Sequence, residues 1–216
     1  MTFHLQLQNT YYPIVEHFST FQGEGCHVGR AAYFIRTYGC PVHCPWCDSA
    51  NTWRPDQRPA KVPKMSAAEL IQLAVEARPD FVVITGGEPA IHDLSPLTSG
   101  LHEAGLRAHI ETSGTFALKG EFDWVTVSPK LYKAPLPELI QRADELKLIV
   151  ENEDSIAYWE RELGPELTRK DRHVWLHPEW GQRENPEILA LIAETVRLRG
   201  APFRAGWQMH KLYNVL

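Results

Sequence analysis

Short hydrophobic runs alternate with amphipathic segments along most of the chain. Runs rich in β-branched and aromatic residues predict strands, and apolar positions repeating every three or four residues predict helices. Strands are expected at 12–17, 31–37, 81–84, 107–112, 124–127, 145–150, 173–177 and 203–209. Helices are expected at 66–77, 94–104, 137–144, 153–162 and 186–199, and loops at 18–25 and 54–64. Ser66 and Glu69 form a capping box that marks where the first of these helices begins.

Alternation of strands and helices predicts parallel strands joined by right-handed crossovers. Polar residues end or closely follow the predicted strands, namely Cys40, Thr85, Glu111, Ser128, His177 and His210. The carboxyl ends of the strands are where a (β/α) barrel carries its active site. About six parallel strands would make an incomplete barrel, open on one side. Periodicity alone does not separate that barrel from an open doubly wound sheet.

Composition narrows the class of protein. The chain has 216 residues, 44% of them hydrophobic and 23% charged, which predicts one globular domain spanning residues 1–216. A net charge of −5 without any block of Lys and Arg argues against direct nucleic-acid binding. No hydrophobic run reaches the length of a membrane span. We therefore expect a cytoplasmic protein that binds neither nucleic acid nor membrane.

Three cysteines, Cys40, Cys44 and Cys47, crowd into the loop after strand 31–37. Thiolates are the usual protein ligands of iron–sulfur clusters, and this spacing lets one loop present three of them to three irons of a 4Fe–4S cluster. The fourth iron would stay open, where a small molecule could coordinate and receive an electron.

These cysteines could instead bind zinc or form disulfides. Zinc could be bound by Cys26 together with the three loop cysteines, or with His43 among the ligands, although zinc sites usually show two separated ligand pairs. Disulfides are less favoured, because the chain is long enough for a normal core and has no apolar secretory segment at its start. Reduced cysteines fit better, and zinc remains an alternative.

Two motifs together resemble those of radical S-adenosylmethionine enzymes. The first is the Cys-x3-Cys-x2-Cys loop with the aromatic Trp46 before its last cysteine, and the second is Gly-Gly-Glu-Pro at 86–89. The resemblance sharpens to the 7-carboxy-7-deazaguanine synthase family. The motifs that carry it are Phe21–Gly25, Cys47–Ser49, Glu111–Gly114, Val127–Lys130 and Gln208–Lys211. These motifs span nearly the whole chain, and the superfamily resemblance favours the incomplete barrel.

This resemblance implies the residues of the site. Cys40, Cys44 and Cys47 are expected to hold the cluster, and Ser49 to bind Mg2+. Residues expected to contact S-adenosylmethionine are Trp46, Cys47, Asp48, Gly86, Gly87, Glu88, Ser128, Pro129, Lys130, His177, Pro178, Glu179 and Trp180. Residues expected to contact the substrate are Phe21, Gln22, Gly23, Glu24, Arg36, Thr85, His210 and Leu216, the last through its terminal carboxylate.

The implied reaction is a radical ring contraction. In the family, a 5′-deoxyadenosyl radical derived from S-adenosylmethionine takes a hydrogen atom from 6-carboxy-5,6,7,8-tetrahydropterin. The substrate radical then contracts its ring and loses ammonia to give 7-carboxy-7-deazaguanine, a precursor of queuosine. The resemblance therefore implies that the protein is a carbon–nitrogen lyase and that its cofactors are the cluster, S-adenosylmethionine and Mg2+. The expected partners are an electron donor such as flavodoxin or ferredoxin and a second copy of the chain in a homodimer.

Three positions depart from the family pattern. Ser49 stands where the family commonly has Thr, and it keeps the hydroxyl but loses the methyl that restricts the rotamer. His177 stands where the family usually has Gln, so a neutral imidazole cannot both donate and accept in the Gln geometry. Leu216 replaces a small residue or proline, and Cys26 matches no family ligand.

Two rival functions explain part of the pattern. A radical enzyme that activates a glycyl-radical protein would share the cysteine spacing, but it would need a broad groove rather than a small polar pocket. A zinc-stabilised binding module without catalysis explains the cysteines and leaves the Gly-Gly-Glu-Pro motif unexplained.

Overall fold

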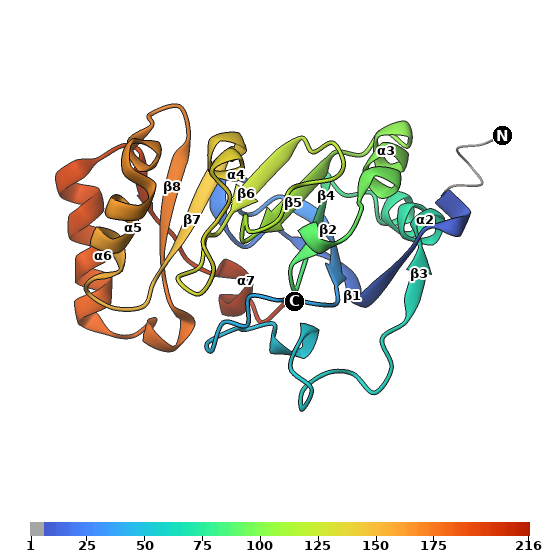
Figure 1. Cartoon of the computed structure of the whole chain (residues 1–216), viewed down its shortest axis with the longest axis horizontal. Coiled ribbons are helices and arrows are strands. Elements are labelled where there is room, and N and C mark those ends of the chain that lie inside the picture. The colour runs from blue at the N-terminus through green and yellow to red at the C-terminus, as the bar shows by residue number, and fades with distance from the viewer. Residues whose placement is uncertain (1–6) are drawn as a thin grey trace.

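The computed structural model describes residues 7–216, so the first six residues of the predicted domain lie outside it. A nine-stranded sheet with the order β3-β1-β2-β4-β5-β6-β7-β8-β9 crosses the molecule (Figure 1). The strands are β1 (Tyr11–Phe21), β2 (Ala31–Thr37), β3 (Lys64–Ser66), β4 (Phe81–Gly86), β5 (Ala108–Thr112), β6 (Trp124–Val127), β7 (Glu145–Val150), β8 (His173–Pro178) and β9 (Phe203–Ala205).

The sheet is mostly parallel and does not close. Strands β2 and β4 to β9 pair in parallel, whereas β1 pairs antiparallel with both β2 and β3. Within residues 7–216, β3 and β9 stand at the two ends of the strand order without pairing to each other. The expected incomplete (β/α) barrel, open on one side, is therefore confirmed. It has seven parallel strands where about six were predicted, with β1 and β3 added antiparallel at one end.

Helices cover one face of this sheet and bury the main core against it. They are α2 (Ala67–Ala77), α3 (Ser95–Glu103), α4 (Pro137–Arg142), α5 (Ser155–Leu163) and α6 (Pro186–Arg199). The short α7 (Met209–Leu212) buries no residue and instead bonds the loop after β1 through the Met209 N–H. Helix α2 contacts β1, β2 and β3, and α3 contacts β5. Toward the other end of the sheet, α5 contacts β7, and α6 contacts β8 and β9 (Figure 1). The predicted capping box is present, since Ser66 and Glu69 bond each other's backbone N–H at the start of α2. No helix within residues 7–216 is long and apolar enough to cross a bilayer.

Some element boundaries differ from the sequence-based expectation. Strand β1 continues through Phe21, where a loop was predicted, because pairing with β2 extends to the partners Phe21 and Ala31. The expected strand 203–209 ends at Ala205, and the following residues turn into α7. Strand β3 was not predicted, because three residues carry too little pattern to be distinguished from a loop.

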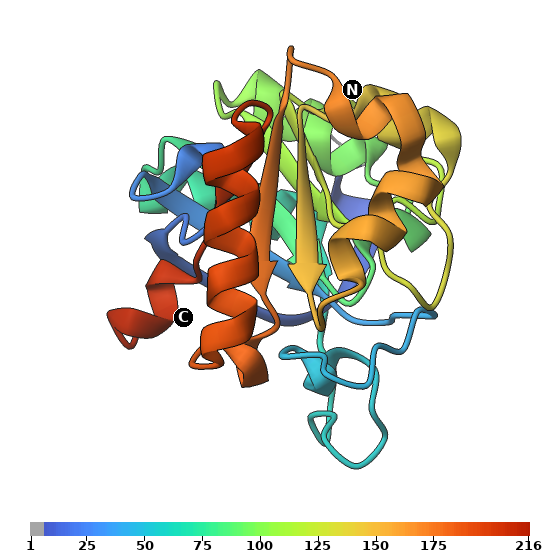
Figure 2. The ribbon, with the colours of Figure 1, turned by 90° about the vertical axis from the view of Figure 1, so that its left-hand side faces the viewer.

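Strand β7 shows how the sheet separates core from site. Successive side chains of a strand point to opposite faces. Leu146, Leu148 and Val150 are buried in the core beneath the helices. Lys147 and Ile149 point the other way and line a pocket. Strands β7 and β8 both run toward the edge where the cysteine loop lies (Figure 2).

Candidate active site

One pocket opens at the carboxyl ends of the parallel strands, and nearly all of the predicted site residues line it. The exception is Pro129, which is not among the lining residues. The residues come from the loop after β1, the cysteine loop after β2, the ends of β4 to β8, and the tail after β9. Parallel topology thus gathers motifs that lie far apart in the sequence, as expected at this edge of an α/β sheet.

The cysteine loop turns sharply so that its three thiols reach the pocket. Gly39 and His43 both have positive φ, of 103° and 59°, and the Cys47 N–H donates to the Cys44 carbonyl at 3.2 Å. Burial raises the pKa of Cys44 to about 11, while nearby Lys130 opposes that rise. Burial also raises the pKa of Cys40, although the backbone N–H groups of Val42 and His43 stabilise its thiolate. Lys130 near Cys44 and the N–H groups beside Cys40 would thus favour the thiolate form of these two ligands once a cluster is bound.

All three thiols of the loop line the pocket. Among residues 7–216, no three His, Cys, Asp or Glu side chains gather closely enough to hold one metal ion. Zinc needs ligand sulfurs about 2.3 Å from a single centre. Cys26 is not a lining residue, and its backbone N–H contacts Glu145 instead. The arrangement fits an iron–sulfur cluster and gives no support to the alternative zinc site.

The Gly-Gly-Glu-Pro turn after β4 packs directly against the cysteine loop. A Cβ on Gly86 would strike the backbone of Thr37, and one on Gly87 would strike the carbonyl of Gly39. The φ of Gly86 is 136°, which side chains other than glycine rarely tolerate. Glycine is therefore required at both positions for the two loops to share one wall of the pocket.

Glu88 ties this turn to the end of β5. Its carboxylate is 1% exposed and accepts hydrogen bonds from the Thr112 hydroxyl at 2.6 Å and the Ser113 N–H at 2.8 Å. The Ala90 N–H and the Ser113 hydroxyl donate to it as well. Since both oxygens are already satisfied by the protein, the side chain braces the turn.

A partly buried ionic network crosses the pocket floor. The Lys147 ammonium lies 2.5 Å from a Glu24 oxygen and 3.4 Å from a Glu111 oxygen, and the Gln22 amide donates to Glu111 at 2.9 Å. Burial alone would raise the pKa of Glu24, but Lys147 more than offsets this and holds that pKa below its usual range. Burial would lower the pKa of Lys147, yet Glu111 and Glu24 raise it instead. Glu24 and Lys147 are therefore both charged near neutral pH.

The C-terminal tail closes over this network. The Gln208 amide donates to Glu24 at 2.7 Å and to Asp48 at 3.1 Å, and the Lys211 ammonium lies 3.0 Å from Asp48. The Met209 N–H donates to the Gly23 carbonyl at 3.0 Å. The tail thus joins the loop after β1 to the residue that follows Cys47.

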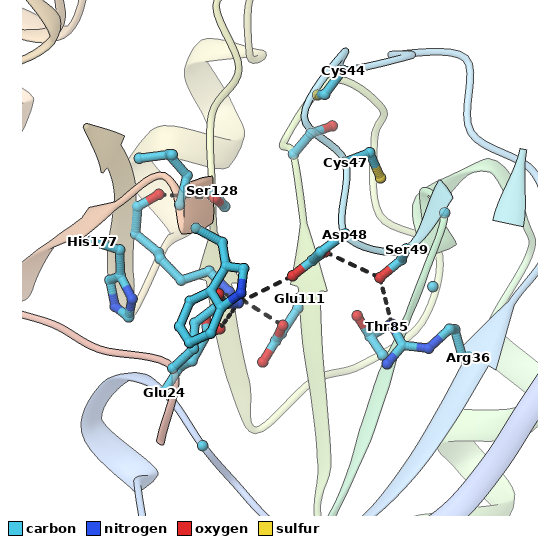
Figure 3. A pocket seen from close by; sticks show the side chains of 18 of the residues that line it. Glu24, Arg36, Cys44, Cys47, Asp48, Ser49, Thr85, Glu111, Ser128 and His177 are labelled. Carbon is cyan, nitrogen blue, oxygen red and sulfur yellow. Dashed lines mark hydrogen bonds and ion pairs between the residues drawn. The ribbon is translucent and has the colours of Figure 1, made fainter. Parts of the chain in front are cut away.

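A second polar chain runs from the cysteine loop to β1. Arg36 donates to Glu16 at 2.6 Å and to the Ser49 hydroxyl at 3.1 Å, and Ser49 donates to Asp48 at 3.3 Å (Figure 3). Thr85 lies beside Arg36, because the two residues are partners in the pairing of β2 with β4. This chain offers one guanidinium, one hydroxyl and one carboxylate on the same side of the pocket.

The opposite wall carries Ser128, Lys130 and His177. Lys130 donates to the Ser128 hydroxyl at 2.6 Å and lies 5.5 Å from the centre of the Trp46 ring, and burial lowers its pKa. His177 is 1% exposed, and neither of its ring nitrogens has a hydrogen-bond partner in the described chain. Burial lowers its pKa to about 4, so the ring is neutral. An unpartnered buried imidazole costs free energy unless a bound molecule satisfies it.

The chain is similar to known proteins over nearly its whole length. A sequence profile of the radical SAM superfamily matches residues 34–152. The 7-carboxy-7-deazaguanine synthase of Synechocystis sp. is 43% identical over 97% of this chain and 96% of that protein. The Escherichia coli K12 7-carboxy-7-deazaguanine synthase is 38% identical over 94% of this chain and 99% of its own length. This chain belongs to the 7-carboxy-7-deazaguanine synthase family.

The fold agrees with this family membership. The crystal structure of QueE from Escherichia coli superposes with a TM-score of 0.82 at 35% identity, covering 97% of this chain and 99% of that one. As a member of the radical SAM superfamily, the chain is a radical SAM enzyme, for which a 4Fe–4S cluster and S-adenosylmethionine are the implied cofactors.

Three members of the polar network around Glu24 in this 7-carboxy-7-deazaguanine synthase family member were not among the predicted site residues. They are Glu111, Lys147 and Gln208. Lys147 had a sequence signal, because the run Glu-Leu-Lys-Leu-Ile-Val places polar residues at alternate positions of a strand between other buried strands. Such a strand should be apolar on both faces, so a charge there indicates a polar cavity.

Proposed function

We propose that this enzyme converts 6-carboxy-5,6,7,8-tetrahydropterin into 7-carboxy-7-deazaguanine with loss of ammonia, as a carbon–nitrogen lyase. The observation that carries the proposal is that the three thiols, the Gly-Gly-Glu turn and the Glu24–Lys147–Glu111 network all open onto one pocket. The names of the relatives support the same activity.

Cys40, Cys44 and Cys47 would hold the cluster, and Gly86, Gly87 and Ser128 would border bound S-adenosylmethionine. When bound, the reduced cluster and S-adenosylmethionine supply the radical that removes a hydrogen atom from the substrate. His177 would give one hydrogen bond to the bound molecules, because its neutral ring is buried without a partner. The protein's own contribution is to orient both molecules and to keep water away from them.

The loop after β1 and the ionic network would bind the pterin. Glu24 and Glu111 are charged acceptors, suited to the N–H groups on the edge of an aminopyrimidinone ring. Arg36 would pair with the substrate carboxylate, exchanging part of its contact with Glu16 for a bidentate one. Gln22, Thr85 and His210 would complete the enclosure.

Mg2+ would be bound by the Ser49 hydroxyl, with the substrate carboxylate and water completing its shell. Mg2+ takes oxygen ligands, keeps several waters, and commonly uses only one or two protein groups. The Asp48 carboxylate lies 3.3 Å from the Ser49 hydroxyl and could orient one of those waters. S-adenosylmethionine, the cluster and Mg2+ would then meet at the same loop.

Several broader features belong to the same proposal. A single domain would carry the activity in the cytoplasm, as a homodimer charged by a donor such as flavodoxin or ferredoxin. The rival role as activator of a glycyl-radical protein is not favoured, because the Glu24 and Lys147 side chains are only 10% and 13% exposed, which favours a small ligand over a protein.

An anaerobic assay tests the proposal. Reconstituted, reduced enzyme is incubated with S-adenosylmethionine, with and without the pterin, and the products are identified by mass. We expect 7-carboxy-7-deazaguanine only when the pterin is present. Formation of 5′-deoxyadenosine without any deazapurine, from enzyme with verified iron and sulfide, would contradict the substrate assignment. Zinc without iron would contradict the radical chemistry altogether.

A further inference from the structure

Glu145, at the start of β7, is a buried carboxylate that no step of the proposed chemistry uses. Its side chain is on the inner face of the sheet, below Lys147, and the residue is 3% exposed. One oxygen accepts from the Cys26 N–H at 2.8 Å and from the Trp175 indole N–H at 2.9 Å. The other accepts from the Thr126 hydroxyl at 2.8 Å. Three donors thus bond this carboxylate, and one of them, the Cys26 N–H, belongs to the loop after β1.

The same loop also packs its backbone against Glu145. Gly25 has a φ of 71°, and a Cβ there would meet the Glu145 carboxylate, with its Cδ at 2.9 Å. The loop presents Gln22 and Glu24 to the pocket just before this contact. Residues 145 and 147 lie on one face of β7, two positions apart. Strand β7 therefore holds the loop twice, by backbone through Glu145 and by side chain through Lys147.

We propose that Glu145 is a positioning residue that fixes loop 22–27 and so aims Gln22 and Glu24 at the substrate. The assignment of a substrate to this loop rests on the proposed function, whereas the anchoring itself does not. Without the Glu145 oxygens, the Cys26 and Trp175 N–H groups would lie buried and unpaired, a state that folded chains avoid. The loop would then leave the sheet to hydrate its N–H, and Glu24 would lose its fixed distance to Lys147.

Hydrogen bonding, rather than charge, is what this role requires. A Glu145→Gln side chain keeps one oxygen for the two N–H donors, and its amide can donate to the Thr126 hydroxyl, which also accepts. A Glu145→Ala side chain offers no acceptor. In Gly25→Ala the added methyl group would collide with the Glu145 carboxylate and push it away from the loop. The three variants therefore separate loss of the acceptor, loss of the charge and loss of the contact.

Steady-state kinetics and hydrogen exchange of the anaerobic holoenzyme test the proposal. For Glu145→Ala we expect the KM for the pterin to rise about tenfold while kcat changes less than about twofold. Cleavage of S-adenosylmethionine in the absence of the pterin should be unchanged. Glu145→Gln should stay within about threefold of the wild type, and Gly25→Ala should resemble Glu145→Ala. The combined variant should be less impaired than the product of the two single effects, because both remove one contact.

Amide exchange reports the anchoring without any turnover. We expect residues 22–27 to exchange faster in Glu145→Ala and at the wild-type rate in Glu145→Gln. The control Glu194→Gln, on the exposed face of α6, should match the wild type in both measurements. Unchanged exchange and KM in Glu145→Ala would overturn the proposal, as would parallel losses of kcat, S-adenosylmethionine cleavage and thermal stability. If wild-type enzyme forms no deazapurine while loop exchange still depends on Glu145, the proposed function fails and the anchoring stands.

Discussion

The sheet face that points away from the helices has charged residues toward one end of its strands and aromatic and histidine rings at the other. Toward the carboxyl ends, charged groups are held in pairs, as in the contact of Lys147, inside β7, with Glu24 in the loop after β1. At the amino ends, four rings close the sheet: His109 stacks on Phe81 at 4.1 Å, and His27 lies 4.8 Å from His109 and 4.6 Å from Trp124. One end is built to receive a polar ligand, and the other to exclude water.

The difference shows how burial acts on titrating groups with and without a partner. At the carboxyl ends, the opposite charge of Lys147 outweighs burial, and Glu24 stays ionised. At the amino ends, no such partner outweighs burial, and the pKa of His109 falls to about 3, with His27 adding to the effect. Buried charges persist only where they are compensated. Charged groups with an oppositely charged partner therefore lie in the pocket. The ring cluster at the other end, which we call the plug, consists of Phe81, His109, His27 and Trp124, and its histidines are neutral where burial lowers their pKa.

Loss of a cluster ligand should have the largest effect on the polar end. We expect Cys47→Ser to lower cluster iron and sulfide after reconstitution to near background and to reduce product formation by about a thousandfold or more. The matched control is Cys26→Ser, because Cys26 contacts Glu145 outside the pocket. Iron and sulfide assays check both variants. A Cys26→Ser protein that lost its cluster as fully as Cys47→Ser would contradict the assigned ligand set.

Removing the central cation should be the next largest effect. Lys147→Met keeps the length of the side chain but leaves Glu24 and Glu111 buried without their partner. The two carboxylates would then repel each other and leave the positions proposed for pterin binding, so kcat/KM for the pterin should fall by about a hundredfold. Lys147→Arg should recover part of the activity. Kinetics in which the Met variant equals the Arg variant would show that charge at this position is irrelevant.

The two ends were not equally accessible from the sequence. The cysteines, the glycine turn and the polar residues after each strand are local motifs, and the parallel topology gathers them without further information. Lys147 sits inside a strand, and its role appears only when β6, β7 and β8 are side by side. The contacts of His27 with His109 and Trp124 form only because the loop after β1 packs against the amino ends of β5 and β6. Residues 25–27 carry no local pattern that predicts this long-range contact. Sequence therefore predicted the strand ends well and the strand interiors poorly.

Acid should destabilise the protein through the plug. The unfolded chain protonates His109 near its ordinary pKa of 6.5, and the folded chain only near 3, so stability present above pH 6.5 is lost as the pH falls toward 3. At pH 5.5 the loss from this residue should be about 1–2 kcal/mol relative to pH 7.5.

His109→Phe should remove that part of the pH dependence. Thermal unfolding of the wild type and the variant at pH 5.5, 6.5 and 7.5 measures it, with an expected reduction of the acid shift in Tm by about 3–6 °C. His102→Gln, which loses a histidine paired with Asp123 near the surface, is the control. An acid shift equally large in His109→Phe would mean that other groups, such as His177, dominate the titration.

The smallest effect should come from Ser49, at the boundary between the cluster loop and the Arg36 chain. Ser49→Thr restores a methyl that limits the rotamer while keeping the hydroxyl, so the Mg2+ concentration for half-maximal activity should fall by about two- to threefold. Ser49→Ala removes the oxygen and should abolish the Mg2+ response, at some cost to Arg36, which donates to this hydroxyl. A Mg2+ titration of all three proteins separates the two roles. If the Ala variant responds to Mg2+ like the wild type, the hydroxyl serves only to hold Arg36, and the metal is bound by other groups of the polar end.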